Sequence, residues 1–315
     1  MGSAHQGFRR KGRIGAADPP CILAVHTDYV QRFIFEELDI RGRLVCLTGA
    51  WERMVEGRNY PLHIAQLLGQ TTALAVLLGA NRKGAGRTTL QVRGNGPVPL
   101  LVADCGSDAQ SADLRIRGMA HHADGASGSV RELIGEGRFA LMLEDSKSGQ
   151  IYQSVVPLQG ETLAEIFEHY LTQSEQMPSF LRLFADEGAL CGLLLEKLPK
   201  ADERDADGWN RMTQLAATLA LPETLGAQPY DLLTRLFPEE LLRVFKLDRV
   251  EYHCPYDAGK VIDMLRSLGR AEVESILAEK GEVLIRNEMC NHEYRFDAEA
   301  VTQMFEAQPG EASHG

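Results

Sequence analysis

The stretch VLIRNEMCNHEYRF, residues 283–296, carries a cysteine and a histidine, Cys290 and His292, that are separated by one residue. A thiolate and an imidazole are two of the side chains from which proteins build zinc sites. A cysteine can also form a disulfide, or lie buried as a small apolar residue. Metal binding, thiol oxidation and simple packing are therefore three open interpretations of this segment.

The remaining cysteines are far apart and form no C-x-C or C-x-x-C pair: Cys21, Cys46, Cys105, Cys191 and Cys254. Cys46, Cys105 and Cys191 stand in the apolar contexts LVCLT, VADCG and ALCGL, which favours core packing over nucleophilic chemistry. No apolar stretch of signal-peptide length follows the basic N-terminal residues, so we expect a reducing, cytoplasmic compartment without structural disulfides as the default.

The composition is that of a soluble globular protein, with 44% hydrophobic and 24% charged residues in a chain of 315. The apolar run at 71–80 is far shorter than the roughly 20 residues that span a membrane, so no membrane partner is expected. The formal net charge is -11 and the basic residues beyond the N-terminal leader are scattered, which argues against nucleic acid as the partner. No nucleophile–base set or complete phosphate loop emerges, so the sequence predicts no enzyme.

Periodicity predicts an α+β protein in which an N-terminal mixed α/β core has a largely antiparallel sheet. Pro61 should begin a helix, and the Asn-Gly pair within Gly94-Asn95-Gly96 predicts a tight β-hairpin turn with positive φ angles. Thr162 and Glu165 predict a capping box at the start of a second helix. We divide the chain into a disordered leader, the core, a helical linker, a small α+β unit and a disordered tail, at 1–27, 28–198, 199–249, 250–305 and 306–315.

In the linker, prolines separate short amphipathic helices. Four apolar residues, here called the linker face, have the i, i+3, i+4 spacing of one helix side: Leu232, Leu233, Leu236 and Phe237. Such a segment can pack on the core or separate from it. The C-terminal unit of about 50 residues is too small for a generous core, so we expect it to depend on a metal, a disulfide or a partner.

Nearly the whole chain from Asp28 to Thr302 resembles the heat-shock protein 33 family of ATP-independent, redox-regulated holdase chaperones. The matching stretches, in this order, are RGRLVCLTGAW (41–51), YPLHIAQLLGQ (60–70), LQVRGNGPVPLLVADC (90–105), VVPLQGETLAEIFEHYLTQSEQMPS (155–179), GLLLEKLP (192–199), LFPEELLRVF (236–245) and MCNHEYRFD (289–297). The resemblance implies an α/β core, a helical linker that senses unfolding and a small zinc-binding redox domain. It also implies that four cysteines bind one zinc ion while reduced, and that their oxidation expels the zinc and exposes apolar surface to clients.

This sequence departs from the family's cysteine pattern. By the resemblance, Cys254 and Cys290 occupy two of the four ligand positions, while Tyr256 and Asn287 occupy the other two. A site of Cys254, Cys290, His292 and a carboxylate is one interpretation, and His253, Asp257 and Glu288 are further local donors. The loss of a tight zinc site is the interpretation we favour, so no cofactor is expected.

Two interpretations without metal follow from the same resemblance. Thiols that would share one zinc ion lie close enough for a Cys254–Cys290 disulfide, which would close a loop of 36 residues and form a simplified redox switch. Alternatively, both cysteines are packed in an ordinary core and Tyr256 fills the space left by the metal.

The function that the resemblance implies is a holdase that binds unfolding proteins through the linker face and the core surface beneath it. The partners would be unfolded or partly unfolded client proteins, and homodimer formation is left open. Because only two of the family's four zinc-ligand cysteines are present, activity would be constitutive or triggered in another way. The alternative from another class is a binding module that uses the same fold for one dedicated partner without chaperone activity.

Overall fold

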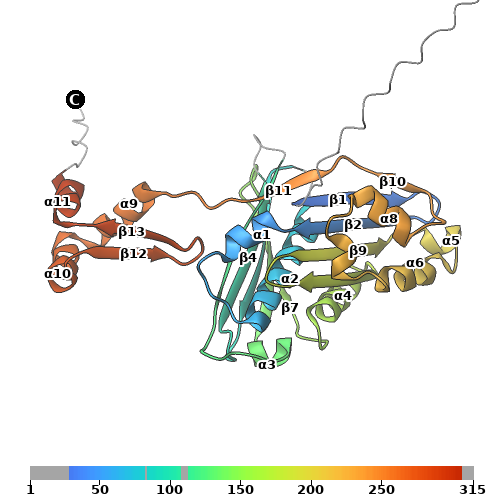
Figure 1. Ribbon diagram of the computed structural model, residues 1–315, viewed down its shortest axis with the longest axis horizontal. Coiled ribbons are helices and arrows are strands. Elements are labelled where there is room, and N and C mark those ends of the chain that lie inside the picture. Colours follow the sequence, from blue (N-terminus) through green and yellow to red (C-terminus); the bar gives the residue numbers. More distant parts are fainter. Residues whose placement is uncertain (1–27, 82–83, 108–112, 307–315) are drawn as a thin grey trace, which may run out of the picture.

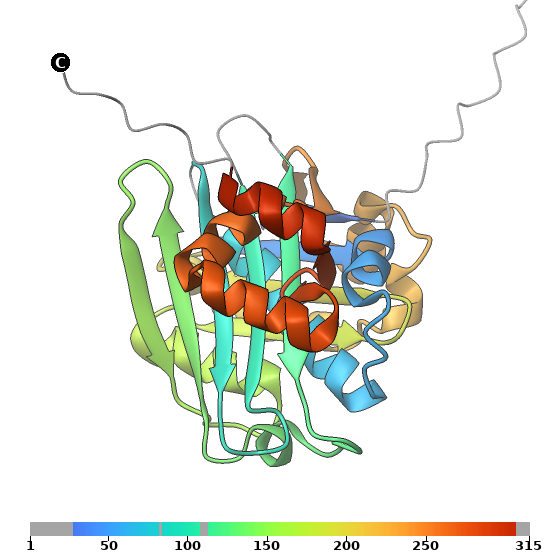
Figure 2. The ribbon, with the colours of Figure 1, turned by 90° about the vertical axis from the view of Figure 1, so that its left-hand side faces the viewer.

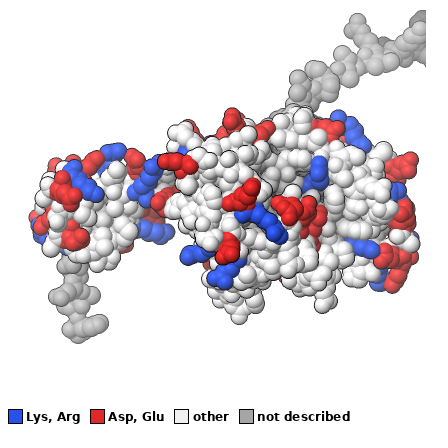
Figure 3. All heavy atoms as spheres, turned by 90° about the horizontal axis from the view of Figure 1, so that it is seen from below, with Lys and Arg blue, Asp and Glu red and all other residues white. Residues whose placement is uncertain are grey.

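The computed structural model describes residues 28–81, 84–107 and 113–306. The leader expected at 1–27 and all but the first residue of the tail expected at 306–315 lie outside this range. Figure 1 shows a large body with a small C-terminal unit projecting from one end, and in Figure 2 this unit lies in front of the body. On the face seen in Figure 3, acidic and basic side chains are interspersed between broad areas that carry neither charge.

The body is built on one large sheet. Its strands are β1 (Tyr29–Phe35), β2 (Ile40–Leu47), β3 (Gly86–Arg93), β4 (Leu100–Ser107), β5 (Leu114–His121), β6 (Arg138–Asp145), β7 (Ile151–Val156), β8 (Ser179–Ala185), β9 (Leu190–Lys197), β10 (Leu242–Val244) and β11 (Asp248–Tyr252). Their order is β7-β6-β3-β4-β5-β11-β1-β2-β9-β8, and β10 also pairs with β1. Only the pairing of β11 with β5 is parallel among the pairings described, which confirms the predicted α+β class with a largely antiparallel sheet.

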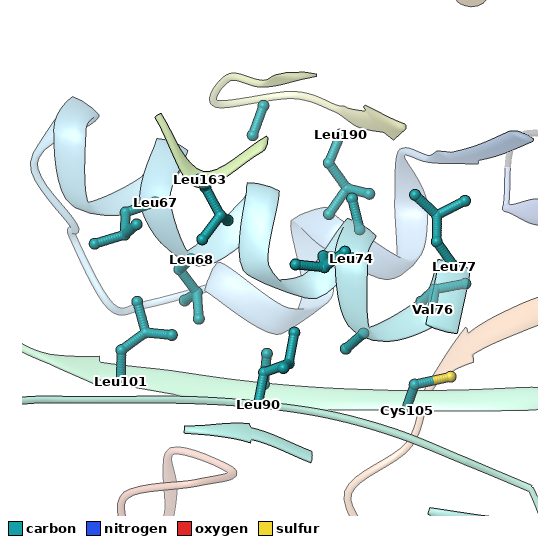
Figure 4. Close-up of a cluster of buried hydrophobic side chains, with 14 of the residues drawn as sticks. Leu67, Leu68, Leu74, Val76, Leu77, Leu90, Leu101, Cys105, Leu163 and Leu190 are labelled. Carbon is teal, nitrogen blue, oxygen red and sulfur yellow. The ribbon is translucent and has the colours of Figure 1, made fainter. Parts of the chain in front are cut away.

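Helix α2 (Leu62–Gly79) lies at the centre of the body and begins directly after Pro61, as predicted. Its 18 residues are long and apolar enough to cross a membrane by length and composition, although the apolar run in the sequence suggested a shorter stretch. Most of the helix is buried, because it is apolar around much of its circumference and packs against the sheet. Figure 4 shows its leucines between Leu90 and Leu101 on one side and Leu190 on the other.

Three further helices accompany the sheet, namely α1 (Gly49–Val55), α3 (Val130–Ile134) and α4 (Leu163–Ser174). At the start of α4, Thr162 Oγ1 accepts a hydrogen bond from the Glu165 amide at 3.2 Å, which is the predicted cap. The reciprocal half of the capping box is not formed, because the Glu165 carboxylate accepts from the amide of Glu161 instead, at 2.8 Å.

The connection between β3 and β4 corrects a prediction. The two strands are present, but residues 94–99 join them, and neither Asn95 nor Gly96 has a positive φ. Helix α3 explains the glycine, because a Cβ on Gly96 would lie 2.6 Å from the carbonyl oxygen of Leu133. The Gly96 amide also donates to the Ile134 carbonyl at 3.0 Å. Close packing of α3, rather than a tight turn, is thus the reason for the small residue.

Short helices of the linker cover one face of the strands β1, β2, β9 and β8 (Figure 1). They are α5 (Ala201–Arg204), α6 (Gly208–Ala217), α7 (Leu221–Thr224) and α8 (Pro229–Leu236). Alternate strand residues point to opposite faces of a sheet, so Val45 and Leu194 pack with α2 while Leu44 and Leu193 pack with the linker. The linker therefore covers the face opposite to α2. The stretch expected as helical at 199–249 also holds β10, and its expected end falls inside β11.

The C-terminal unit consists of α9 (Ala258–Leu268), α10 (Arg270–Lys280), β12 (Val283–Asn287), β13 (His292–Phe296) and α11 (Ala298–Glu306). Strands β12 and β13 form a separate antiparallel pair. Its small core holds the buried side chains of Leu265, Val273, Val283, Tyr294, Phe296, Val301 and Met304. In Figure 1 this unit and the linker helices lie at opposite ends of the body.

Candidate redox site and linker face

A disulfide joins Cys254 to Cys290 in the C-terminal unit. Cys254 lies in the extended segment between β11 and α9, and Cys290 lies in the turn between β12 and β13. The two Cα atoms are 5.6 Å apart, within the range of ordinary disulfides, and the bond closes a loop of 36 residues. Asn291 has a φ of 57°, a left-handed conformation that asparagine tolerates well in turns and that reverses the chain directly after Cys290.

Three aromatic rings from the two segments that carry the cysteines lie together. Tyr256 stacks on Tyr294, with ring centroids 4.4 Å apart and planes 22° apart, and lies 5.7 Å from the ring of His292. The Tyr294 hydroxyl accepts a hydrogen bond from the Asp257 amide at 3.1 Å. The aromatic stack thus occupies the side of the segment where the family pattern would place a second cysteine.

The residues present do not fit a zinc site with four donors. The two thiols are bonded to each other, and no group of three or more His, Cys, Asp and Glu side chains is placed to hold a metal within the described chain. The other predicted donors have different partners. Asp257 caps α9 by accepting from the Lys260 amide at 3.1 Å, and the Glu288 carboxylate lies 2.8 Å from Nε2 of His121 on β5.

His292, the best predicted substitute ligand, is one residue beyond the cysteine turn. Its Nδ1 is buried and has no hydrogen-bond partner. The Asn287 side chain accepts from the Cys290 amide at 3.3 Å and so stabilises the turn. These residues support the shape of the turn, but they do not complete a tetrahedral donor set.

The contacts that attach this turn to the body were not predicted from the sequence. Arg58, in the loop between α1 and α2, donates to the carbonyl oxygens of Glu288 and Met289, both at 2.8 Å. The Tyr252 hydroxyl at the end of β11 donates to the Cys290 carbonyl at 3.4 Å. A half-buried arginine whose acceptors are backbone atoms about 230 residues away leaves no local pattern that could reveal the contact.

The linker face packs on the sheet as a unit. Leu232, Leu233 and Phe237 are 3%, 0% and 1% exposed, and Leu236 is half-buried at the edge. Phe237 lies with its ring centroid 4.9 Å from that of Phe35 in an edge-to-face arrangement. The predicted face is therefore brought together, but at the far end of the body from the disulfide (Figure 1).

The fold and site define a class of protein. Its members have a mixed sheet with short helices covering one of its apolar faces, joined to a small unit with a cysteine pair. The family model described as Hsp33 protein matches residues 28–297. The chain belongs to the Hsp33 family.

Individual relatives agree with this assignment. The 33 kDa chaperonin of Chromobacterium violaceum is 37% identical over 284 residues, which cover 89% of this chain and 95% of that protein. The 33 kDa chaperonin of Pseudomonas paraeruginosa is 38% identical over 288 residues, with 89% and 95% covered. The crystal structure of the 33 kDa chaperonin from Thermotoga maritima superimposes with a TM-score of 0.74 at 21% identity, covering 89% of this chain and 98% of that one. The names of the relatives support a chaperone function.

Proposed function

We propose that this protein is an ATP-independent holdase chaperone that binds unfolding proteins and prevents their aggregation. The observation that carries the proposal is the apolar face of β1, β2, β9 and β8, which is covered by short linker helices. We further propose that it acts in the cytoplasm, catalyses no reaction and requires no metal.

The energetics of the linker make its separation from the sheet feasible. Helices α5 to α8 have between 4 and 10 residues, and isolated helices of that length are not stable in water. Their stability comes from packing, and a fully buried leucine or phenylalanine contributes about 1.5–3 kcal/mol. A stress that weakens this packing would release the linker as a whole rather than one helix at a time.

Release would expose side chains suited to binding unfolded chains. Beneath the linker lie Tyr29, Phe33, Phe35, Leu44 and Leu195, all buried. A client segment of apolar residues would bind there because apolar surface on both sides leaves water. This binding draws on burial alone, which explains why no nucleotide would be needed.

The test compares Leu233→Asp with Tyr230→Asp on the same helix. A charge at Leu233, which is 0% exposed, has to leave the core, whereas Tyr230 is 53% exposed and tolerates a charge. Light scattering from a thermally unfolding client is measured with reduced, chelator-treated protein and without nucleotide. We expect Leu233→Asp to suppress aggregation more strongly than the unchanged protein, and Tyr230→Asp to match it.

Protease sensitivity of residues 221–240 is measured on the same samples. If Leu233→Asp increases linker cleavage without any gain in suppression, the sheet face is not the client site. A pull-down that returns one stoichiometric protein, together with no protection of model clients, would instead favour the dedicated binding module.

A further inference from the structure

A second pair of cysteines lies directly under the linker. Cys46 on β2 and Cys191 on β9 are opposite each other in the antiparallel register, and their sulfur atoms are 3.0 Å apart. Both thiols are free and buried, at 3% and 0% exposed. Directly opposed residues on antiparallel strands have Cα atoms within the range that a disulfide requires.

The linker residue that covers this pair is Thr224, the last residue of α7. Its hydroxyl oxygen lies 2.8 Å from the Cys191 sulfur, and its carbonyl oxygen lies 4.0 Å from the Cys46 sulfur. The Thr224 hydroxyl donates to the carbonyl of Leu221 at 2.6 Å, so its oxygen is free to accept from a thiol. Thr224 is itself buried, at 1% exposed, so both of its contacts with sulfur are shielded from water.

We propose that Cys46 and Cys191 form a second redox pair, which is oxidised to a disulfide when α7 leaves the sheet and whose disulfide then hinders α7 from returning. The inference rests on the proposed function in one respect, namely that the linker separates from the sheet. While α7 is in place the thiols are inaccessible to an oxidant in solution. Oxidation therefore records that the linker has opened.

The electrostatics assign different roles to the two sulfurs. The close contact between the two sulfurs lowers the pKa of Cys46, while the same contact and burial raise the pKa of Cys191. Cys46 is thus the thiol that ionises first and attacks the oxidant, and Cys191 is the thiol that resolves the product.

With hydrogen peroxide as the oxidant, the Cys46 thiolate attacks one peroxide oxygen and the O–O bond breaks. The departing hydroxide takes the proton that Cys46 lost and forms water, leaving a sulfenic acid on Cys46. The Cys191 sulfur then attacks the Cys46 sulfur, the S–O bond breaks, and the oxygen leaves as a second water with the Cys191 proton. Two thiols and one peroxide give one disulfide and two waters.

The disulfide changes what α7 meets on its return. Both thiol protons are lost, so the buried carbonyl and hydroxyl oxygens of Thr224 have no thiol donor beneath them. Formation of the bond also draws the sulfurs from 3.0 Å to about 2.05 Å apart, away from their positions against Thr224. The oxidised sheet therefore binds α7 more weakly than the reduced sheet.

Position distinguishes this pair from the C-terminal disulfide. The turn that carries Cys290 contacts Arg58 and Tyr252, and Figure 1 shows the linker helices α5, α6 and α8 at the other end of the body. Cys46 and Cys191 lie in the same row of the sheet as Tyr29, on the face that the linker covers. Of the two pairs, this is the one whose oxidation acts on linker packing directly.

The test uses the full chain with Cys21, Cys254 and Cys290 replaced by alanine, so that only the three body cysteines remain. Samples with Leu233→Asp, Tyr230→Asp or neither change are treated with hydrogen peroxide, and the peptides linking residues 46 and 191 are quantified by mass spectrometry. We expect the disulfide to form at least tenfold faster with Leu233→Asp than in the other two. Absence of the linked peptide in the Leu233→Asp protein would overturn the inference.

The second measurement is cleavage of the linker by protease before and after oxidation. Oxidised protein should be cleaved several-fold faster within residues 217–228, and a reductant should reverse the effect. Cys46→Ala/Cys191→Ala should not respond to peroxide, whereas Cys105→Ala should respond like its parent, since that thiol lies under α2 rather than under the linker. A disulfide that forms without changing linker cleavage would refute the proposed role.

A milder variant guards against misfolding. Thr224→Val keeps the shape of the side chain but removes the hydroxyl, so linker cleavage in the reduced protein should rise several-fold. Thr224→Ser keeps a hydroxyl, so its linker should be cleaved at the rate of the unchanged protein. Equal cleavage in all three proteins would count against the contact. None of these readouts involves a client, so oxidation that releases the linker without protecting clients would contradict the proposed holdase function and leave the redox pair intact.

Discussion

Loss of the Cys254–Cys290 bond should destabilise the C-terminal unit far more than any other part of the molecule. The bond closes a loop of 36 residues, and the chain-entropy relation for a loop of that length gives about 4 kcal/mol. The unit has a small core built around Leu265, Tyr294 and Phe296. A core of this size supplies only a few kcal/mol, so the disulfide accounts for much of the unit's stability.

Hydrogen exchange of backbone amides measures this effect locally. In Cys254→Ala/Cys290→Ala, the amides of β12 and β13 should exchange roughly 10²–10³ times faster than in the oxidised protein, since each tenfold change corresponds to about 1.4 kcal/mol. Amides of β2 and β9 should not change, because they belong to the separate core of the body.

Reduction of the unchanged protein provides the control. A reductant removes the cross-link but keeps both side chains, and Cys290 is only 6% exposed, so the alanine variant also loses packing. If loop closure dominates, the reduced protein and the alanine variant exchange at similar rates. An increase below tenfold in the reduced protein would refute the entropy argument and show that contacts to the body, such as those of Arg58, stabilise the turn instead.

Three further predictions concern the buried ion pair between β2 and β9 and the arginine that contacts the cysteine turn. Glu196→Gln should lower the free energy of unfolding, measured by urea denaturation, by about 3–5 kcal/mol. The reason is that Arg43, 3% exposed and ion-paired to Glu196, would be left without its counter-charge. Burial alone would raise the pKa of Glu196, but Arg43 and Arg41, the latter at 2.6 Å, outweigh it and hold the pKa below its ordinary value. This contribution is therefore complete above the unfolded pKa of about 4.3 and is lost as pH falls through the folded pKa, so below pH about 4.3 the urea midpoint of the unchanged protein should fall more steeply than that of Glu196→Gln. Arg58→Met removes two hydrogen bonds to the cysteine turn, so amides around Cys290 should exchange faster while those of β9 do not; identical exchange would show that the turn is stabilised within its own unit.

Local patterns were sufficient where the local sequence decides the structure. Pro61 and the apolar run after it fix α2, and the hydroxyl of Thr162 caps α4, because both effects act within one or two turns of helix. The face of Leu232 and Leu233 follows from helical spacing and is buried as predicted. The family resemblance added the class of fold, which the comparisons confirm.

Patterns failed where distant segments decide the structure. The Asn95-Gly96 pair has the composition of a tight turn, but α3 packs on this loop and selects a longer connection. The proximity of Cys46 and Cys191 depends on the register of β2 against β9 across 145 residues, which no window of sequence shows. Both cysteines were correctly predicted as buried, but their pairing could only be seen in the folded chain.

The two cysteine pairs should respond to oxidation in opposite ways. Bonding Cys254 to Cys290 closes a loop and strengthens the C-terminal unit, whereas bonding Cys46 to Cys191 removes donors from the surface on which α7 packs. The path between the two sites runs through β11, which leads from the linker's end to Cys254 and pairs with β1 and β5 of the body. A disulfide at Cys254 leaves those pairings in place, so it should not release the linker by itself.

Comparison of two double variants separates these effects. After peroxide treatment under conditions that open the linker, Cys254→Ala/Cys290→Ala should keep its gain in suppression of client aggregation, and Cys46→Ala/Cys191→Ala should lose most of it. The reverse pattern would mean that the C-terminal unit acts on the linker through β11, with strand pairing in the body as the element that changes. Because each variant retains the other pair, unequal responses assign the redox response to one of the two cysteine pairs.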